Sequence, residues 1–532
     1  MLKKIGINLY KSLVILIIVP VIITAQTLRW SFISDGPAHQ DDEVYKVIRA
    51  SDGYVYAVGY QTTSYGKDIT VMKFSRWGVQ QWAYRTLWPG DDVGCDIIYA
   101  GGNLYVAGYA TGQGKEFVVL SLNTSGNYRW SWISDGPDHA DDEAFSICYG
   151  GSYVYAAGYQ TNGGDKDITV FKLSTSGVSQ WAYRSYWSYD DEGYDIIYGS
   201  DGNLYIAGYA GGGGTNLKDF VALSLDASGG ERWSWISDGS ANQDDEAFSV
   251  VYSSGYVYAA GYKTFSSKHI EIDCLSASGT PQWAYRTYWS YDDVGFDIVY
   301  GSDGNLYVAG YANGGGTNMK DFAVLSVNTS GSERWSWISD GSAHQDDEAR
   351  AICYAGNYVC AVGYKTMSGS GKDIEVDCLN TSGTPQWAYR TLWSGNDIGY
   401  SIAYDGWLYV GGYCTGQGRE FTVLSLDPPV AITEDNDMNQ KMSYLIKGYP
   451  NPMQNSITFA ITAKTPGIFN LKIYDQSGKL VKALTNDEFL TDSHEILWDG
   501  KDDNGKNCSA GVYFCKIETQ NLSKVMKIVK LE

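Results

Sequence analysis

The chain has 532 residues, which is enough for more than one domain with a large buried core. Its formal net charge of −22 at pH 7 argues against nucleic acid and anionic membrane surfaces as partners, because a field of that sign repels them. Aromatic residues make up 14% of the sequence, a composition that suits β-strands.

The N-terminus predicts a secretory signal peptide over residues 1–25. A basic start with Lys3 and Lys4 leads into an apolar run at 12–23, and small residues at 24–25 provide a cleavage site. The alternative is a membrane anchor, but a run of about 12 residues is shorter than the ~20 that span a bilayer. No other segment is long enough, so we expect a secreted protein without a transmembrane segment.

Two related motifs then alternate along the chain. RWSWISDGSANQDDE at 232–246 recurs with small changes at 29–43, 129–143 and 334–348. QWAYRTYWSYDDVG at 282–295 recurs at 81–94, 180–193 and 386–399. The first Trp of each copy follows the previous one after 48 to 52 residues, and such a fixed period is typical of a repeat architecture.

Three strand-like runs lie between successive Trp strands, for example at 247–252, 256–262 and 269–275. A four-stranded unit with a period near 50 residues is typical of a β-propeller blade. The chain starts with a Trp strand at 28–34 and ends with a three-strand run at 400–426, so these pieces complete one blade together. We predict an all-β protein with an eight-bladed β-propeller over 28–427, built from four tandem two-blade repeats and closed by the split blade. An open solenoid is the alternative, and it would leave bare sheet edges.

A small second domain is expected at 447–532, after a polar linker at 428–446 that begins with two Pro residues. The motifs of this domain are YPNP at 449–452, LKIYDQSGKLVKAL at 471–484 and WDGKDDNGKNCSAGVYFCKI at 498–517. Their order resembles the type A C-terminal sorting domain of the bacterial type IX secretion system, and also the Ig-like domain of flagellar hook-capping proteins. The residues that carry this resemblance are Tyr449, Pro450, Asn451, Pro452, Trp498, Asp499, Gly500, Gly511 and Tyr513.

The resemblance implies a small Ig-like β-sandwich that directs export across the outer membrane, with the type IX secretion machinery as its partner. An Ig-like module without a sorting role is the alternative. The propeller units resemble secreted bacterial propeller repeats in the segments 303–311 and 321–331, and this implies a fold but hardly a function, since propellers serve many functions.

Nine Cys residues form no regular framework. Cys353 and Cys360 flank a predicted tight turn and are candidates for a disulfide, as are Cys508 and Cys515. A buried, reduced thiol is the expected state of most of the others.

Acidic loops are the main candidates for function. The loop that joins a Trp strand to the next channel-lining strand should lie on the same propeller face as the loop between strands two and three of a blade. This places Asp244-Asp245-Glu246 and the equivalent acids near the channel mouth, together with pairs such as Lys218-Asp219. In the second type of blade an Asp also enters the inner strand in three of the four copies, namely Asp96, Asp195 and Asp297.

Three interpretations of these residues remain open. The acids are turn caps and ion pairs between blades, or they bind Ca²⁺, a cation that prefers oxygen ligands, or they help to recognise a sugar or peptide. The candidate metal ligands are Asp238, Asp244, Asp245 and Glu246. The candidate ligand-binding residues are Tyr186, Trp187, Tyr189, Tyr288, Trp289, Tyr291, Asp195 and Asp297.

The sequence assigns no catalytic residue. Of the five His residues, three share one loop position, where they resemble loop residues rather than a base with partners, and no Ser-His-Asp order emerges. The leading hypothesis is a secreted, monomeric propeller that binds an extracellular glycan or protein, with Ca²⁺ as the one candidate cofactor. The alternative is a secreted polysaccharide-active enzyme, a glycosidase or lyase, that uses an acidic pair at the channel mouth.

Overall fold

The structure is a computed structural model. It describes residues 28–427 except 213–216, 315–318 and 370, and further along the chain 444–449, 453–463, 467–475, 479–490, 493–503, 505–519 and 523–531. The predicted signal peptide, most of the predicted linker, and Pro450, Asn451 and Pro452 lie outside these residues. The chain divides into two compact units, Met1–Pro429 and Val430–Glu532. All regular elements among the described residues are strands. These residues form no helix with the length and apolar character needed to cross a membrane.

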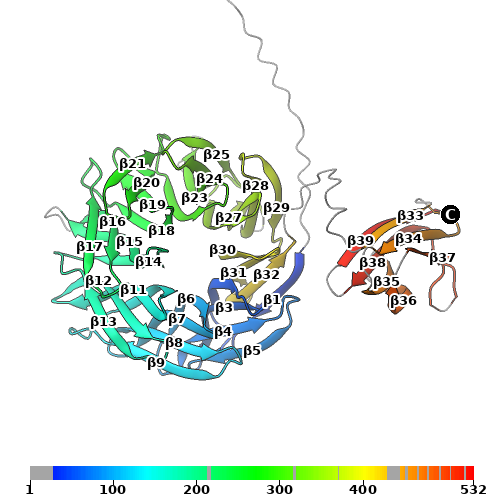
Figure 1. Cartoon of the computed structure of the whole chain (residues 1–532), viewed down its shortest axis with the longest axis horizontal. Helices are drawn as coiled ribbons and strands as arrows, with labels where there is room; N and C mark the ends of the chain where they lie inside the picture. Colours follow the sequence, from blue (N-terminus) through cyan, green and yellow to red (C-terminus); the bar gives the residue numbers. More distant parts are fainter. Residues whose placement is uncertain are drawn as a thin grey trace, which may run out of the picture. The chain divides into compact units, whose positions relative to one another are not determined.

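The first unit repeats a four-stranded antiparallel sheet around a common centre (Figure 1). Most of these sheets consist of four consecutive strands, which run from the centre outward. In the first half of the unit the sheets are β2 (Glu43–Arg49), β3 (Val55–Thr63), β4 (Gly66–Phe74) and β5 (Gln80–Arg85); β6 (Val93–Ala100), β7 (Asn103–Thr111), β8 (Lys115–Asn123) and β9 (Tyr128–Ser134); and β10 (Glu143–Gly150), β11 (Tyr153–Asn162), β12 (Asp165–Ser174) and β13 (Ser179–Arg184). They are followed by β14 (Glu192–Tyr198), β15 (Leu204–Gly212), β16 (Leu217–Leu225) and β17 (Glu231–Ser237); β18 (Glu246–Ser253), β19 (Tyr256–Thr264), β20 (Lys268–Ser276) and β21 (Pro281–Arg286); β22 (Val294–Tyr300), β23 (Asn305–Gly314), β24 (Met319–Asn328) and β25 (Glu333–Ser339); and β26 (Glu348–Ala355), β27 (Tyr358–Met367), β28 (Gly371–Asn380) and β29 (Pro385–Arg390).

One further sheet joins the two ends of the unit. Its strands are β30 (Ile398–Tyr404), β31 (Leu408–Thr415), β32 (Arg419–Leu426) and, from the start of the unit, β1 (Leu28–Ser34). The register pairs Leu28 with Leu426 and Ser34 with Phe421 in antiparallel fashion. The first and last segments therefore complete one sheet, as the split of the repeat predicts, and β1 covers the edge that β32 would otherwise expose.

Burial differs between the strands of a sheet, and this explains their sequences. The second strand β19 is buried along nearly its whole length, because neighbouring sheets cover both of its faces, and its sequence YVYAAGYKT is correspondingly apolar. The outer strand β17 alternates between exposed and half-buried residues. Its Trp233 and Trp235 pack into the core formed by β15 and β16 together with β18, β19 and β20 of the next sheet.

Seven of the eight outer-strand Trp residues also fasten their sheet to a turn of the next one; Trp387 makes no such contact among the described residues. The indole N–H of Trp233 donates to the carbonyl oxygen of Ala277 at 3.0 Å, and its ring lies against Gly279. The same contact recurs in the Trp–Gly pairs Trp30–Gly78, Trp82–Gly126, Trp130–Gly177, Trp181–Gly229, Trp283–Gly331 and Trp335–Gly383. The regular Trp spacing of the sequence thus marks a repeated lock between sheets.

The cysteine pairing differs from both candidate disulfides. Cys360 on β27 is joined to Cys378 on β28, with 4.1 Å between the Cα atoms, and Cys353 is a free thiol. In the strand register Cys360 lies opposite Cys353 on one side and opposite Cys378 on the other. The sequence predicts Cys353 as its partner because Cys353 is closer along the chain, and this prediction is wrong. Cys508 and Cys515 are both free, and Cys515 is buried in the core of the second unit.

The second unit contains two sheets around one core. The first consists of β33 (Tyr444–Tyr449), β34 (Ile457–Ala463) and β37 (Ser493–Trp498), and the second of β35 (Gly467–Asp475), β36 (Leu480–Leu490), β38 (Gly511–Thr519) and β39 (Ser523–Lys530). Trp498 is fully buried in the core and meets Tyr513 edge to face at 5.3 Å between ring centroids. Asp499 accepts the N–H of Lys501, and Gly500 has a φ of +70°. These motif residues therefore build the core and one tight turn, and Gly511 begins β38.

Candidate functional site

The acidic loops hold neighbouring sheets together by a repeated set of hydrogen bonds. In the loop from β17 to β18, Asp244 accepts the N–H of Lys218 at 3.2 Å, and the N–H of Asp245 donates to the carbonyl of Lys218 at 2.8 Å. The same two bonds recur between the other loops and Lys67, Lys115, Lys166, Lys268, Lys320, Lys372 and Arg419. The two kinds of loop lie on one face, as the sequence predicts.

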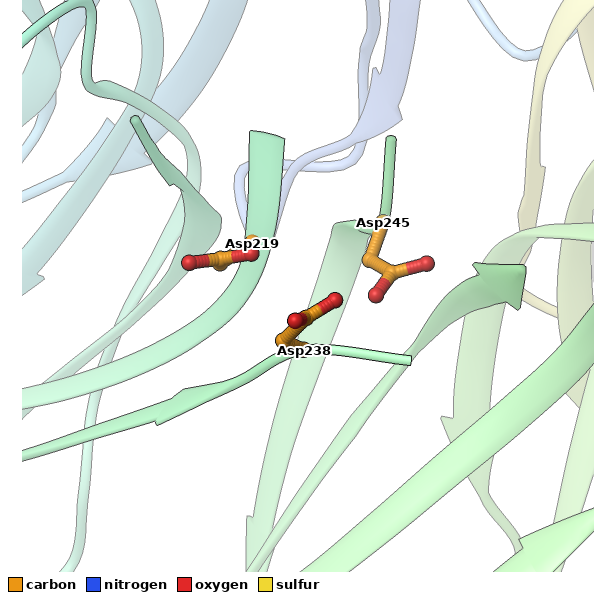
Figure 2. A group of neighbouring side chains, drawn as sticks. All are labelled: Asp219, Asp238 and Asp245. Atoms are coloured by element: carbon orange, nitrogen blue, oxygen red, sulfur yellow. The ribbon is translucent and has the colours of Figure 1, made fainter. Parts of the chain in front are cut away.

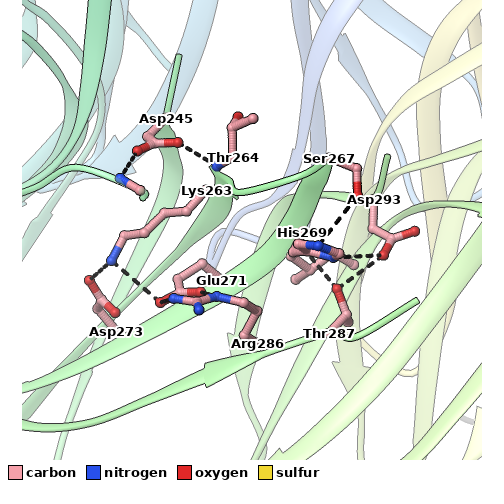
Figure 3. Close-up of polar contacts among 12 residues, drawn as sticks. Asp245, Lys263, Thr264, Ser267, His269, Glu271, Asp273, Arg286, Thr287 and Asp293 are labelled. Atoms are coloured by element: carbon pink, nitrogen blue, oxygen red, sulfur yellow. Dashed lines mark hydrogen bonds and ion pairs between the residues drawn. The ribbon is translucent and has the colours of Figure 1, made fainter. Parts of the chain in front are cut away.

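The second Asp of each loop is fully buried. Asp245 accepts the N–H of Gly239 and the N–H of Thr264 with its two carboxylate oxygens (Figure 3). Its equivalents are also inaccessible to solvent: Asp42, Asp92, Asp142, Asp191, Asp293, Asp347 and Asp397. Burial raises the pKa of Asp245 to about 6 and that of Asp92 to about 7. These carboxylates cap backbone groups inside the junctions and are withdrawn from the surface.

Two groups of three carboxylates have oxygens close enough to hold a cation, Asp219, Asp238 and Asp245 (Figure 2) and Asp321, Asp340 and Asp347. Of the predicted metal ligands, the structure brings Asp238 and Asp245 together and adds Asp219. Asp244 and Glu246 lie elsewhere: Asp244 caps Lys218, while Glu246 accepts from the Lys218 ammonium at 3.1 Å and from the Tyr262 hydroxyl at 2.7 Å.

The buried carboxylates predict an unusual pH dependence of stability. Their pKa values of about 6 to 7 in the folded protein lie above the ordinary value of 3.8, so the folded state binds more protons than the unfolded state between these limits. Their contribution to stability is complete below the unfolded pKa and is lost as pH rises through the folded pKa. We expect a higher melting temperature at pH 5 than at pH 8 in calorimetry at constant ionic strength. A melting temperature that rises from pH 5 to pH 8 would contradict this account.

A central cavity of about 400 Å³ lies between the inner strands. One layer of its lining is mainly aromatic and contains Tyr45, Phe145, Tyr194, Phe248, Phe296 and Tyr400; the adjacent layer is polar and contains Lys46, Asp96, Ser146, Asp195, Ser249, Asp297 and Ser401. Asp195 accepts the N–H of Val250 at 3.0 Å, and Asp297 accepts the N–H of Ile352 at 2.9 Å. Burial raises the pKa of both carboxyls. Asp195 therefore ties β14 to β18, and Asp297 ties β22 to β26.

The predicted aromatic ligand-binding residues occupy a different place. Tyr186 and Tyr288 follow β13 and β21 in equivalent loops, and their side chains are 76% and 85% exposed. Trp187 and Trp289 are partly buried and pack against the cores between neighbouring sheets. Tyr291 is exposed, and Tyr189 is partly exposed with a φ of +70°. The structure therefore does not combine these rings with Asp195 and Asp297 in one site.

Three His residues act within their own loops. The Nδ1 atoms of His39, His139 and His344 contact Asp35, Asp135 and Asp340, and these contacts raise the pKa of each imidazole. All three residues have a positive φ, as does Asn242 at the fourth equivalent position. The shared position reflects loop geometry, which Asn also tolerates.

One polar group was not foreseen in the sequence. The Oγ of Ser267 lies 3.3 Å from Nε2 of His269, and Nδ1 of His269 lies 3.7 Å from Oδ2 of Asp293 (Figure 3). Thr287 donates to the same carboxylate at 3.1 Å. The only advance signal was that His269 replaces the Asp found at the equivalent strand start, as in Asp68, Asp167 and Asp373.

Comparison with known proteins identifies the second unit. Residues 447–531 match the family described as "Secretion system C-terminal sorting domain". This confirms the predicted type IX sorting domain, and the protein is therefore secreted or located at the cell surface. No curated protein matches the sequence.

Several solved structures resemble the chain at low identity. They include PorZ, described as an essential bacterial surface component of the type-IX secretion system of Porphyromonas gingivalis, with 14% identity, coverage of 91% of this chain and 73% of that chain, and a TM-score of 0.39. Sqt1 from Chaetomium thermophilum has 11% identity, covers 76% of this chain and 99% of its own, and has a TM-score of 0.48. The Pan2 WD40 domain from Neurospora crassa has 10% identity, covers 76% of this chain and 96% of its own, and has a TM-score of 0.41. With TM-scores below 0.5, these similarities carry no argument about function.

Proposed function

We propose that residues 28–427 form a closed eight-bladed propeller that binds an extracellular glycan or protein, and that a small Ig-like sorting domain exports it. Eight four-stranded sheets between residues 28 and 427, with β1 paired to β32, support the closed ring. The two sheets of the second unit, which share one core, support the sandwich. The type IX machinery is the partner of this domain during export.

The exposed rings of Tyr186 and Tyr288 carry the binding proposal. A large side chain that is 76% or 85% exposed gains nothing from the core, and both rings stand at the same place in their repeats. Tyrosine faces cover the apolar faces of sugars, while neighbouring acids such as Asp190 and Asp292 accept hydrogen bonds from sugar hydroxyls.

The acidic pairs give less support to a glycosidase or lyase. In each pair the second carboxylate is buried and already accepts hydrogen bonds within its junction, so it is poorly placed to act on a polymer. Calcium at Asp219, Asp238 and Asp245 is a separate proposal, which a comparison of binding with calcium and with EDTA addresses.

A glycan-array screen of the full mature chain tests the proposed function. We expect glycan binding that falls to about half with Tyr186→Ala or Tyr288→Ala, because each change removes one of two equivalent stacking surfaces. In the double variant we expect a loss of about 10-fold or more, because each surface contributes roughly 1–2 kcal/mol. Leu392→Ala is the matched control, since Leu392 occupies the equivalent position, is 84% exposed and lacks a ring. Absence of binding with calcium and with EDTA, or binding that neither Tyr variant weakens, would overturn the glycan proposal.

A further inference from the structure

The group formed by Ser267, His269 and Asp293 has the connectivity of a nucleophile, a base and an orienting acid. Ser267 lies in the turn between β19 and β20 and is partly exposed, so a substrate can reach its hydroxyl. Nε2 of His269 faces this hydroxyl at 3.3 Å, and Nδ1 faces the carboxylate of Asp293 at 3.7 Å. The second distance exceeds a hydrogen bond, but such contacts are often long in free enzymes and shorten when substrate binds.

Burial supports the roles of the two inner members. The His269 side chain is 9% exposed, and its Nδ1 atom is buried without a hydrogen-bond partner among the described residues. Asp293 is fully buried, and the Thr287 hydroxyl and the Asn313 N–H hold its carboxylate. Burial, together with Arg286, lowers the pKa of His269, so its imidazole is neutral and can accept a proton at neutral pH.

This group breaks the symmetry of the repeat. At the equivalent junctions two carboxyls face each other, as in Asp68 with Asp92 and Asp373 with Asp397. The Thr86 hydroxyl lies within hydrogen-bond distance of both Asp68 and Asp92. In each pair the charge of the first Asp helps to raise the pKa of the second. At this junction alone, among the repeats, His269 takes the place of the first carboxyl. A single chemical site requires such a departure, whereas a purely structural junction is served by the Asp pair.

The group also lies beside the aromatic loop of the proposed binding surface. Thr287, at the start of this loop, donates its N–H to Ile270 at 3.1 Å, and Asp292, at its end, accepts the N–H of Lys268 at 2.8 Å. Both contacts fix the loop at 288–291 to the first residues of β20, next to Ser267 and His269. A ligand that stacks on Tyr288 is therefore held close to the serine hydroxyl.

We propose that Ser267, His269 and Asp293 form a catalytic triad that hydrolyses carboxylic esters, and that the natural substrate is an O-acylated glycan. The choice of an O-acylated glycan as the substrate rests on the proposed function. The Ser267 oxygen attacks the ester carbonyl while its proton passes to Nε2 of His269; the carbon–oxygen bond to the sugar then breaks, and the sugar hydroxyl leaves with that proton. Water attacks the acyl-serine, gives a proton through the same nitrogen, and releases the carboxylic acid and free Ser267.

The test uses the full mature chain at pH 8, above the pKa of about 7 to which burial raises Asp293. A fluorophosphonate probe and p-nitrophenyl acetate serve as the reagents, and neither contains a glycan. We expect covalent labelling of Ser267 and ester hydrolysis that falls by ~10²-fold or more in Ser267→Ala and in His269→Asp. His269→Asp restores the carboxyl pair of the equivalent junctions and so preserves the fold, while Ser266→Ala changes the exposed serine next to Ser267 and keeps both readouts.

The outcomes separate this proposal from the proposed function. An unlabelled wild-type protein whose ester hydrolysis equals that of Ser267→Ala would overturn the triad, whatever the glycan array shows. Labelling and hydrolysis that depend on Ser267 and His269, in a protein that binds no glycan, would support the triad and overturn the choice of an O-acylated glycan as substrate.

Discussion

Replacing Asp245 with alanine is expected to lower the free energy of unfolding of the first unit by about 3 kcal/mol. The change leaves the N–H groups of Gly239 and Thr264 without their acceptor inside a junction that water does not reach. Each unsatisfied buried donor costs roughly 1–3 kcal/mol, and the relief of repulsion with Asp219 and Asp238 offsets part of the sum. Urea unfolding followed by tryptophan fluorescence measures the difference.

Asp244→Ala is the matched control for that experiment. Asp244 is the neighbouring acid and accepts a single N–H, from Lys218, at a site that is partly exposed. Water can replace this acceptor, so we expect a loss of no more than about 1 kcal/mol. Equal losses in the two variants would contradict this account, because they would mean that the buried acceptor contributes no more stability than the exposed one.

Gly279→Ala is expected to destabilise the first unit by about 3 kcal/mol, because it affects both backbone and packing. Gly279 has a φ of +84°, a conformation that is unfavourable for alanine. A Cβ atom at this position would also lie 2.5 Å from the Trp233 ring, which would have to leave its place and weaken the indole bond to Ala277.

Gly255→Ala separates the two causes. Gly255 has almost the same φ, +85°, but a Cβ there would meet no atom within 4 Å. We expect a cost of ~1 kcal/mol from the backbone alone. The difference between the two variants in urea unfolding measures the Trp–Gly lock, and a difference near zero would mean that the lock adds no stability.

The strand pattern could be predicted because it depends on local signals. The Trp period, the turns between strands and the odd strand at 28–34 indicate four-stranded units and the pairing of β1 with β32. Trp233 and Trp235 lie two residues apart on one strand, so the alternation of side chains puts both rings on the face that packs against the next sheet. Both inferences require only neighbours in the chain or in the repeat.

The sequence predicts that the acids cap turns between neighbouring units as one of three interpretations, but it could not predict which acid of each pair is buried, because burial depends on distant backbone groups. Asp244 and Asp245 are adjacent in sequence, yet one lies near the surface and the other accepts N–H groups from Gly239 and Thr264 in a closed junction. Sequence distance likewise concealed the approach of Asp293 to His269 and favoured Cys353 over Cys378 as the partner of Cys360. The sequence predicts one ligand-binding set that contains the two channel aspartates and the exposed tyrosines, whereas the fold places the aspartates in the central cavity and the tyrosines in outer loops.

The central claim is that the repeated aromatic loops bind ligand, and titration calorimetry of the full mature chain with the best glycan from the array tests it most directly. Because Tyr186 and Tyr288 occupy equivalent positions in separate loops, the account predicts about two glycans per chain, about one after either Tyr→Ala change and none after both. Binding whose stoichiometry and affinity are unchanged in the double variant would contradict it.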